Sequence, residues 1–134
     1  MTLKHYILEE SSHKTLYDYL GYYPDDDEVL WEFVSPYQFK NDKIDSPKEM
    51  NIEELYNNLN VVGGYEKYKD SVKGIEKESK IKIKDIRKNI REYIDDPIII
   101  MEDELIDGYH RLVAFYLENI DKIKVLDIST METF

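Results

Sequence analysis

The chain has 134 residues, of which 42% are hydrophobic and 35% are charged. This size accommodates one globular domain over residues 1–134 and leaves little room for a second, and the apolar content excludes a disordered chain. Its 29 acidic and 18 basic residues give a net charge of −11, which disfavours binding to nucleic acid, and the absence of cysteine excludes disulfides, thiolate metal ligands and a cysteine nucleophile.

The first half of the chain is predicted to contain two helices and one strand. The opening segment, residues 6–20, places apolar side chains at helical spacing near its end, and Gly21 stops the short helix. Residues 29–34 are rich in aromatic and β-branched side chains and end at Ser35-Pro36, which predicts the first strand. Apolar residues on one helical face predict a second helix over residues 52–59.

The middle of the chain is basic and helical in pattern. Residues 65–80 are mostly charged, and we interpret residues 60–80 either as a polar helix or as a mobile insertion. Beyond them, isoleucines at positions 83, 86, 90 and 94 form an apolar stripe opposite lysine and arginine residues, which predicts an amphipathic helix. We interpret the basic stretch over residues 67–91 as a solvated helix face, because acidic residues are interspersed in it, and we expect no sequence-specific DNA binding.

The last third alternates between strands and a helix. Pro97 ends the amphipathic helix, and the apolar run of residues 98–101 predicts a buried strand. An acidic turn over residues 102–104 leads into a return strand, which Asp107-Gly108 ends before a helix over residues 109–117. Residues 123–128 predict a last strand. The expected fold is therefore α/β (α+β), with a small mixed sheet flanked by helices.

The junction at Gly108 is the one part of the sequence that predicts chemistry. A glycine turn followed by His110 and Arg111 at the first turn of a helix is typical of an anion site, because free backbone N–H groups and cationic side chains converge there. His110 is a candidate proton donor. The alternative is structural: Asp107 would cap the helix, and Arg111 would pair with the acidic turn.

Residues 83–128 resemble the ParB/sulfiredoxin superfamily. The resemblance lies in the amphipathic helix, the run Asp96-Pro97-Ile98-Ile99-Ile100, the motif from Leu105 to Ala114 that contains Asp107-Gly108-Tyr109-His110-Arg111, and a final strand around Val125. It implies a small α/β domain that binds nucleotide phosphates, those of ATP in sulfiredoxins and of CTP in ParB proteins. The phosphate-contacting positions it implies are Gly108, Tyr109, His110 and Arg111, of which His110 and Arg111 are the candidate catalytic residues.

The resemblance also limits the function. Sulfiredoxins carry a reactive cysteine where this chain has Tyr109, so reduction of sulfinic acids by that route is excluded. We do not expect a role in chromosome partition, because only about twenty residues follow the motif helix. Single-domain members of the superfamily include free-serine kinases and proteins described as nucleases, which makes this chain a candidate phosphotransferase or nuclease. The carboxylates considered for a catalytic acid are Glu32, Asp42, Asp45 and Glu49.

Metal ligands are sparse in the sequence. His5 and His13 have no neighbour at metal-ligand spacing, so we expect no transition-metal site. Asp103, Glu104 and Asp107 have the hard oxygen ligands that Mg²⁺ prefers, and Mg²⁺ would accompany a bound ATP or CTP. Polar residues required by a hairpin turn explain the same three positions.

The charge distribution predicts an alternative function of a different class. Residues 1–60 carry 13 acidic and 5 basic side chains, and residues 95–134 carry 10 and 3. Such a protein can act as an acidic inhibitor that occupies the basic groove of a nucleic-acid-handling protein, as anti-restriction or anti-CRISPR proteins of phages and mobile elements do. The acidic residues that would form this interaction are Asp25, Asp26, Asp27, Glu28, Glu102, Asp103 and Glu104.

We expect the chain to be cytoplasmic and to have no membrane partner. Its start, Met1-Thr2-Leu3-Lys4-His5, lacks the apolar segment of a secretory signal, and the sequence contains no run of apolar residues long enough to cross a membrane.

Overall fold

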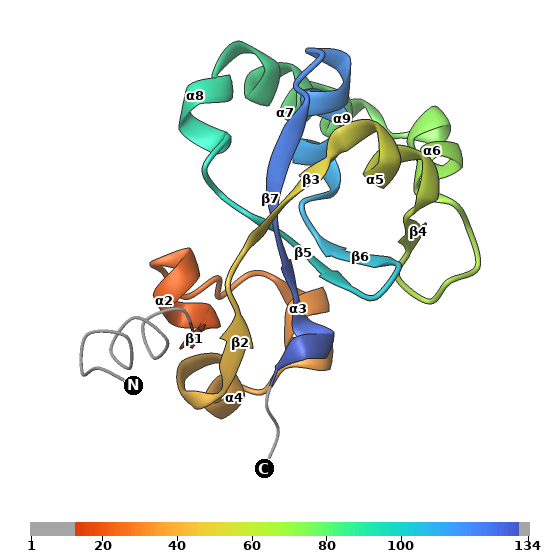
Figure 1. The fold of residues 1–134 in the computed structure, drawn as a ribbon. Coiled ribbons are helices and arrows are strands. Elements are labelled where there is room, and N and C mark those ends of the chain that lie inside the picture. The colour runs from red at the N-terminus through yellow and green to blue at the C-terminus, as the bar shows by residue number, and fades with distance from the viewer. Residues whose placement is uncertain (1–12, 132–134) are drawn as a thin grey trace.

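A mixed five-stranded sheet lies at the centre of the computed structural model, which describes residues 13–131 (Figure 1). The strand order is β3-β7-β5-β6-β4. β7 pairs parallel with β5 and antiparallel with β3, while β6 pairs antiparallel with β5 and parallel with β4. The expected mixed α/β fold is confirmed. The strands are β3 (Lys48–Asn51), β4 (Asn60–Val61), β5 (Ile98–Met101), β6 (Glu104–Asp107) and β7 (Lys122–Asp127).

Both faces of this sheet are buried. In β5, Ile98 and Ile100 belong to one core cluster, and Ile99 belongs to a second cluster on the opposite face. Leu105 and Ile106 of β6 divide between the two clusters in the same way. Because successive side chains of a strand point to opposite faces, a strand covered on both faces needs an uninterrupted apolar run. The run of residues 98–101 is therefore the buried strand that its sequence predicts.

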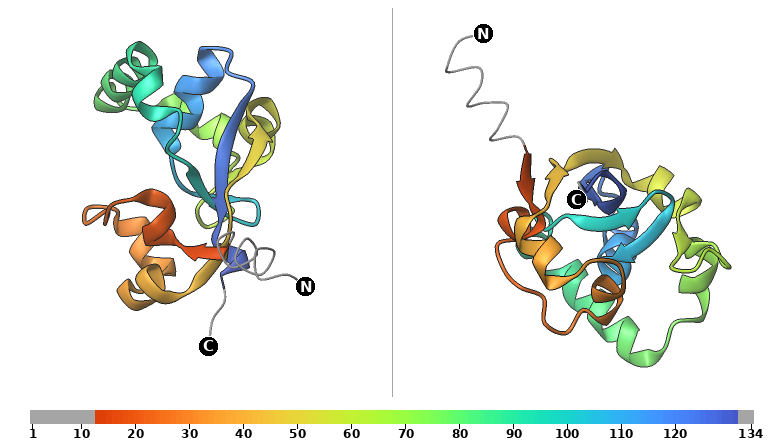
Figure 2. Two further views of the ribbon diagram at one scale, coloured as in Figure 1. Left: turned by 60° about the vertical axis from the view of Figure 1, so that its left-hand side comes forward. Right: turned by 90° about the horizontal axis from the view of Figure 1, so that it is seen from below.

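The helices from residue 52 to residue 117 cover one face of the sheet (Figures 1 and 2). The predicted helices over residues 52–59 and 109–117 are confirmed, and the predicted amphipathic helix is present but broken at Asn89. The Asn89 side chain donates to the Asp85 carbonyl at 2.9 Å, and such bonds from asparagine to the backbone compete with helix propagation. The elements are α5 (Ile52–Asn58), α6 (Tyr68–Ser71), η1 (Val72–Gly74), α7 (Lys77–Lys88), α8 (Ile90–Tyr93) and α9 (Tyr109–Leu117).

The N-terminal elements cover the other face (Figure 2). Their core contains the fully buried Leu16, Leu30 and Phe39, which pack with Ile99 and Leu126 of the sheet. Of the helix expected over residues 6–20, residues 6–12 lie outside the described residues, residues 13–15 form a strand instead, and residues 16–20 are helical as predicted. The elements are β1 (His13–Thr15), α2 (Leu16–Leu20), α3 (Glu28–Phe33), α4 (Pro36–Asn41), β2 (Lys43–Asp45), which pairs with β1, and the C-terminal η2 (Ile128–Thr130).

The prediction of a strand over residues 29–34 is wrong, because this segment forms α3. The carboxylate of Asp27 accepts from the N–H of Leu30 at 3.1 Å and caps the helix. Leu30 and Val34 lie four residues apart and are both buried, as the inward face of a helix requires. Helix capping and burial therefore outweigh the β-propensity of the aromatic residues here.

Residues 60–80, which the sequence left open, contain β4, the two short helices α6 and η1, and the first residues of α7. Tyr68 in α6 is fully buried and anchors the segment to the core. Of the two interpretations, the segment is partly helical, in short pieces. No helix within residues 13–131 is long and apolar enough to span a membrane.

Candidate functional site

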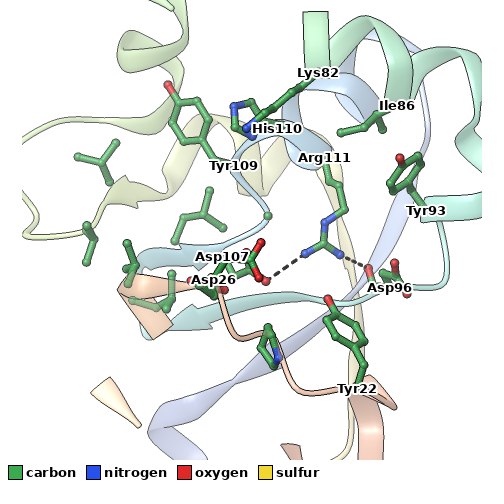
Figure 3. A pocket seen from close by; sticks show the side chains of 18 residues that line it. Tyr22, Asp26, Lys82, Ile86, Tyr93, Asp96, Asp107, Tyr109, His110 and Arg111 are labelled. Carbon is green, nitrogen blue, oxygen red and sulfur yellow. Dashed lines mark hydrogen bonds and ion pairs between the residues drawn. The ribbon is translucent and has the colours of Figure 1, made fainter. Parts of the chain in front are cut away.

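A cavity of about 660 Å³ lies where the end of β6 meets the start of α9 (Figure 3). The loop before α3 forms one wall, and α7 and α8 contribute to another. The cavity therefore lies between the N-terminal elements and the helical layer. Its polar and charged lining residues are Tyr22, Asp26, Asp27, Lys82, Tyr93, Asp96, Asp107, Tyr109, His110 and Arg111.

Gly108 makes the strand-to-helix junction possible. Its φ angle is +107°, and a Cβ atom at this position would lie 2.5 Å from Cγ2 of Ile98. Only glycine fits both the backbone conformation and the close approach to β5. Gly108 is the N-cap of α9, and among the described residues no side chain caps this helix. The N–H groups of the first turn are therefore left for a ligand or water, as predicted for an anion site.

Arg111 is held at the cavity by three hydrogen bonds. One guanidinium nitrogen donates to the carbonyls of Asp96 at 2.8 Å and Pro97 at 3.1 Å, and the other donates to Asp107 Oδ2 at 3.3 Å. The structural alternative for this motif is wrong in both details, because Arg111 pairs with Asp107 and not with the acidic turn, and Asp107 does not cap α9. The bonds fix a cationic side chain in the cavity wall.

His110 lies beside Lys82, the second cationic side chain of the cavity wall. Its Nε2 atom is 3.1 Å from Ser79 Oγ of α7. Burial lowers the pKa of His110, and the charge of Lys82 lowers it further. The imidazole is therefore neutral at neutral pH, where it can donate a hydrogen bond through one nitrogen and accept through the other.

Asp27 is a functional candidate at the cavity that the sequence did not indicate. In the sequence it belongs to the acidic run of residues 25–28, and in the structure it lines the cavity. Burial raises the pKa of Asp27 to about 6, and the charge of Asp107 and a hydrogen bond with its carboxyl group add to the increase, while Leu30 and Arg111 act in the opposite direction. Two carboxylates in one site disfavour each other's ionisation. The signal that distinguishes Asp27 is its position as the cap of α3, which turns its carboxylate inward.

Tyrosine side chains line both sides of the cavity. Tyr22 points toward Arg111 from the N-terminal wall, and Tyr93 lies beside Arg111 on the opposite side (Figure 3). Burial raises the pKa of Tyr22, as does the charge of Asp107. Tyr109 lines the cavity too, and its hydroxyl lies 2.8 Å from Ser71 Oγ.

The four carboxylates considered from sequence for a catalytic acid lie elsewhere. Glu32 is exposed on α3, and Asp42 follows α4 as its C-cap. Asp45 ends β2 opposite His13, and Glu49 of β3 is exposed opposite Lys124. None of the four is part of the cavity wall formed by the described residues. The carboxylates that do line it are Asp26, Asp27, Asp96 and Asp107.

The residues expected to bring Mg²⁺ are divided between two places. Asp107 lines the cavity, whereas Asp103 is in the β5–β6 turn, where its carboxylate accepts from Asn60 at 3.3 Å. Glu104 begins β6 and is not a lining residue in the described part of the chain. Within residues 13–131, no three His, Asp or Glu side chains are grouped so that they could hold a metal ion. His5 lies outside the described residues.

The residues of the alternative, inhibitory surface form two groups. Asp25, Asp26 and Glu28 are exposed in and after the loop before α3, and Asp27 is directed into the cavity. Glu102 and Asp103 are exposed at the β5–β6 turn, where Glu102 has a φ angle of +57°.

Comparisons of the chain with protein-family models, with curated proteins and with solved structures gave no match. The geometry of this cavity is therefore the basis for assigning a function.

Proposed function

We propose that the cavity at the start of α9 binds the phosphate groups of a nucleotide or another phosphorylated ligand. The observation that supports this proposal is the convergence of the uncapped N-terminus of α9, Arg111, His110 and Lys82 on one cavity. A helix N-terminus favours negative charge, and arginine and lysine add fixed positive charge around the same space. Phosphate oxygens are the ligand chemistry that fits such a set of donors.

The residues have distinct roles in this proposal. Gly108 permits close approach of the ligand, and the N–H groups of Tyr109 and His110 donate to phosphate oxygens. Arg111 supplies charge from a position fixed by its bonds to the Asp96 and Pro97 carbonyls. Lys82 reaches the cavity from α7 and neutralises a second phosphate group.

The arrangement of elements supports the hypothesis of a ParB/sulfiredoxin-like domain. The amphipathic helix, the buried strand, the hairpin and the motif helix follow one another as the resemblance implies, with Gly108 at a strand-to-helix junction. On this hypothesis the ligand is ATP or CTP. Mg²⁺ would arrive with the nucleotide, and Asp107 is the one member of the expected acidic set that lines the cavity.

Asp27 extends the proposal from binding to phosphoryl transfer. A carboxyl group with a pKa of about 6 can accept a proton near neutral pH, and this property suits a general base. In a transfer step, the oxygen of an acceptor hydroxyl or water would form a bond to phosphorus, the bond to the leaving phosphate oxygen would break, and the hydroxyl proton would pass to Asp27. A phosphotransferase and a nuclease both need such a base.

The proposal is tested by isothermal titration calorimetry with ATP, CTP and their diphosphates, with and without Mg²⁺. The wild type should bind at least one of them, and Arg111→Ala should weaken binding at least tenfold because it removes a charge-assisted contact. Arg87→Ala is the matched control, since Arg87 pairs with Glu118 at 2.6 Å and is not part of the cavity wall. Equal affinities of Arg111→Ala and the wild type would refute the assignment of the site.

A further inference from the structure

Tyr68 connects the segment of residues 60–80 to the proposed anion site. Its side chain is fully buried, and its hydroxyl donates to the carbonyl of Tyr109, the first residue of α9. The two residues are 41 positions apart in the sequence. The short helix α6, which the sequence pattern could not place, thus contacts the backbone that forms the cavity wall.

This contact is part of a closed set of hydrogen bonds. Ser71 Oγ donates to the carbonyl of Tyr68 at 2.8 Å and lies 2.8 Å from the hydroxyl of Tyr109. The rings of Tyr68 and Tyr109 pack edge to face, with centroids 5.0 Å apart. α6 and the first residue of α9 are therefore joined through both the side chain and the backbone of Tyr109.

The hydrogen bond from Tyr68 acts on a specific peptide group. The Tyr109 carbonyl belongs to the same peptide unit as the N–H of His110, and in a trans peptide these two groups point in opposite directions. A donor on the carbonyl side holds the plane of this peptide and polarises it, which strengthens the N–H as a donor on the other side. The His110 N–H is one of the uncapped groups at the start of α9.

The hydroxyl of Tyr68 is more than a packing group. Tyr68 lies in an apolar cluster, and burying a hydroxyl there costs free energy unless it is bonded. The Tyr109 carbonyl is also placed to accept the ordinary helical bond from the N–H of Val113. Burial raises the pKa of Tyr68, so this donor keeps its proton throughout the pH range in which the protein would bind ligands.

We propose that Tyr68 is a positioning residue of the anion site, which holds and polarises the Tyr109–His110 peptide so that the His110 N–H donates to a bound phosphate. This inference rests on the proposed function, and it assigns a role to residues 60–80 that the resemblance of residues 83–128 does not supply.

Tyr68→Phe tests the inference, because it keeps the buried ring and removes the hydroxyl. Binding of pyrophosphate is measured by isothermal titration calorimetry for the full-length wild type and variants. Tyr68→Phe should weaken binding about three- to tenfold, as expected for the loss of one hydrogen bond. Tyr56→Phe is the matched control, because the ring of Tyr56 also contacts the ring of Tyr68 edge to face and stacks on the ring of Tyr116.

A second measurement, the NMR shift of the His110 amide proton, reports on the Tyr109–His110 peptide group directly. In the amide NMR spectrum of the ligand-free protein, the His110 proton should move upfield in Tyr68→Phe and stay in place in Tyr56→Phe, because only the first variant removes the donor from its peptide. Ser71→Ala removes a hydrogen bond to the Tyr68 carbonyl but keeps the Tyr68 side chain. It should therefore weaken pyrophosphate binding and shift the His110 amide proton upfield, both by less than Tyr68→Phe does.

The outcomes distinguish this inference from the proposed function. If Tyr68→Phe binds pyrophosphate as tightly as the wild type does, or if its His110 amide shift is unchanged, this inference is overturned and the proposed function is not. If the wild type does not bind pyrophosphate or any of the nucleotides, the proposed function is overturned and this inference with it.

Discussion

Arg111 and Asp107 form an ion pair of 3.3 Å across the junction between β6 and α9. The same guanidinium bonds to the carbonyls of Asp96 and Pro97 at the start of β5, so that one side chain joins the ends of two strands to a helix. Arg111, whose charge is proposed to contact the ligand, therefore also stabilises the fold.

Because of this double role, replacing Arg111 should lower the free energy of unfolding. Arg111→Ala leaves two carbonyls and a half-buried carboxylate without their donor, so we expect a loss of about 1–3 kcal/mol in the free energy of unfolding, measured by urea denaturation. Arg111→Lys should recover only part of it, because an ammonium group cannot reproduce the fork of a guanidinium. Full recovery with lysine would mean that charge alone matters at this position.

The junction glycine offers a second test with an internal control. In Gly108→Ala, the new residue must adopt a positive φ angle, and its Cβ atom would lie 2.5 Å from Cγ2 of Ile98. Gly21 also has a positive φ angle, +78°, but a Cβ atom there would have no non-neighbouring atom within 4 Å. We expect Gly21→Ala to lower the free energy of unfolding by about 1 kcal/mol and Gly108→Ala to lower it by about 2–4 kcal/mol, as measured by urea denaturation. Equal costs would show that the contact with Ile98 relaxes freely.

Asp27 predicts a pH dependence of stability. Its pKa of about 6 in the folded protein lies above the usual 3.8, so the folded state binds the proton more tightly. The contribution of this group to stability is therefore complete below about pH 4, decreases as the pH rises to about 6, and is constant above that. Asp27→Asn keeps a good helix cap and has no proton to lose.

The difference in unfolding free energy between the wild type and Asp27→Asn isolates this group from the other carboxylates. Relative to the variant, the wild type should become less stable between pH 4 and pH 7 in urea denaturation. Parallel stability curves for the two proteins would show that Asp27 titrates normally in the folded state.

His110 predicts an effect on a pKa that NMR can measure directly. Burial is the main cause of its lowered pKa, and Lys82 is the second. Lys82→Met should therefore raise the pKa of His110 toward its usual range without restoring it fully, as followed by the chemical shifts of its ring protons. Lys122→Met, at an exposed position of β7, is the control and should leave the His110 titration unchanged.

The fold from α7 onward could be predicted because its patterns are local. The apolar stripe of α7, the run of isoleucines in β5 and the break at Gly108 each follow from the period of one element or the geometry of one residue. The same holds for Arg111 and His110, since the start of a helix places its first residues together whatever the rest of the chain does.

The chain before α7 could not be predicted in the same way, apart from the helix over residues 52–59. Its elements are two to seven residues long, and α3 depends on a cap from Asp27 and on burial against β6 and the rest of the N-terminal core. Asp27 and Asp107 are 80 positions apart, and only the packing of the N-terminal elements over the sheet brings them together. The contact between Tyr68 and Tyr109 has the same origin in tertiary structure.

The most direct test of the phosphate site is an amide NMR titration of the isotope-labelled protein with the best-binding nucleotide, or with pyrophosphate if the nucleotides bind alike. Phosphate binding at α9 predicts that the largest shifts fall on the amides of residues 108–111, with smaller ones near Lys82. Largest shifts at the acidic loop of residues 25–28 or the turn of residues 102–104, or no shifts with any of these ligands, would contradict the site and favour the acidic inhibitor.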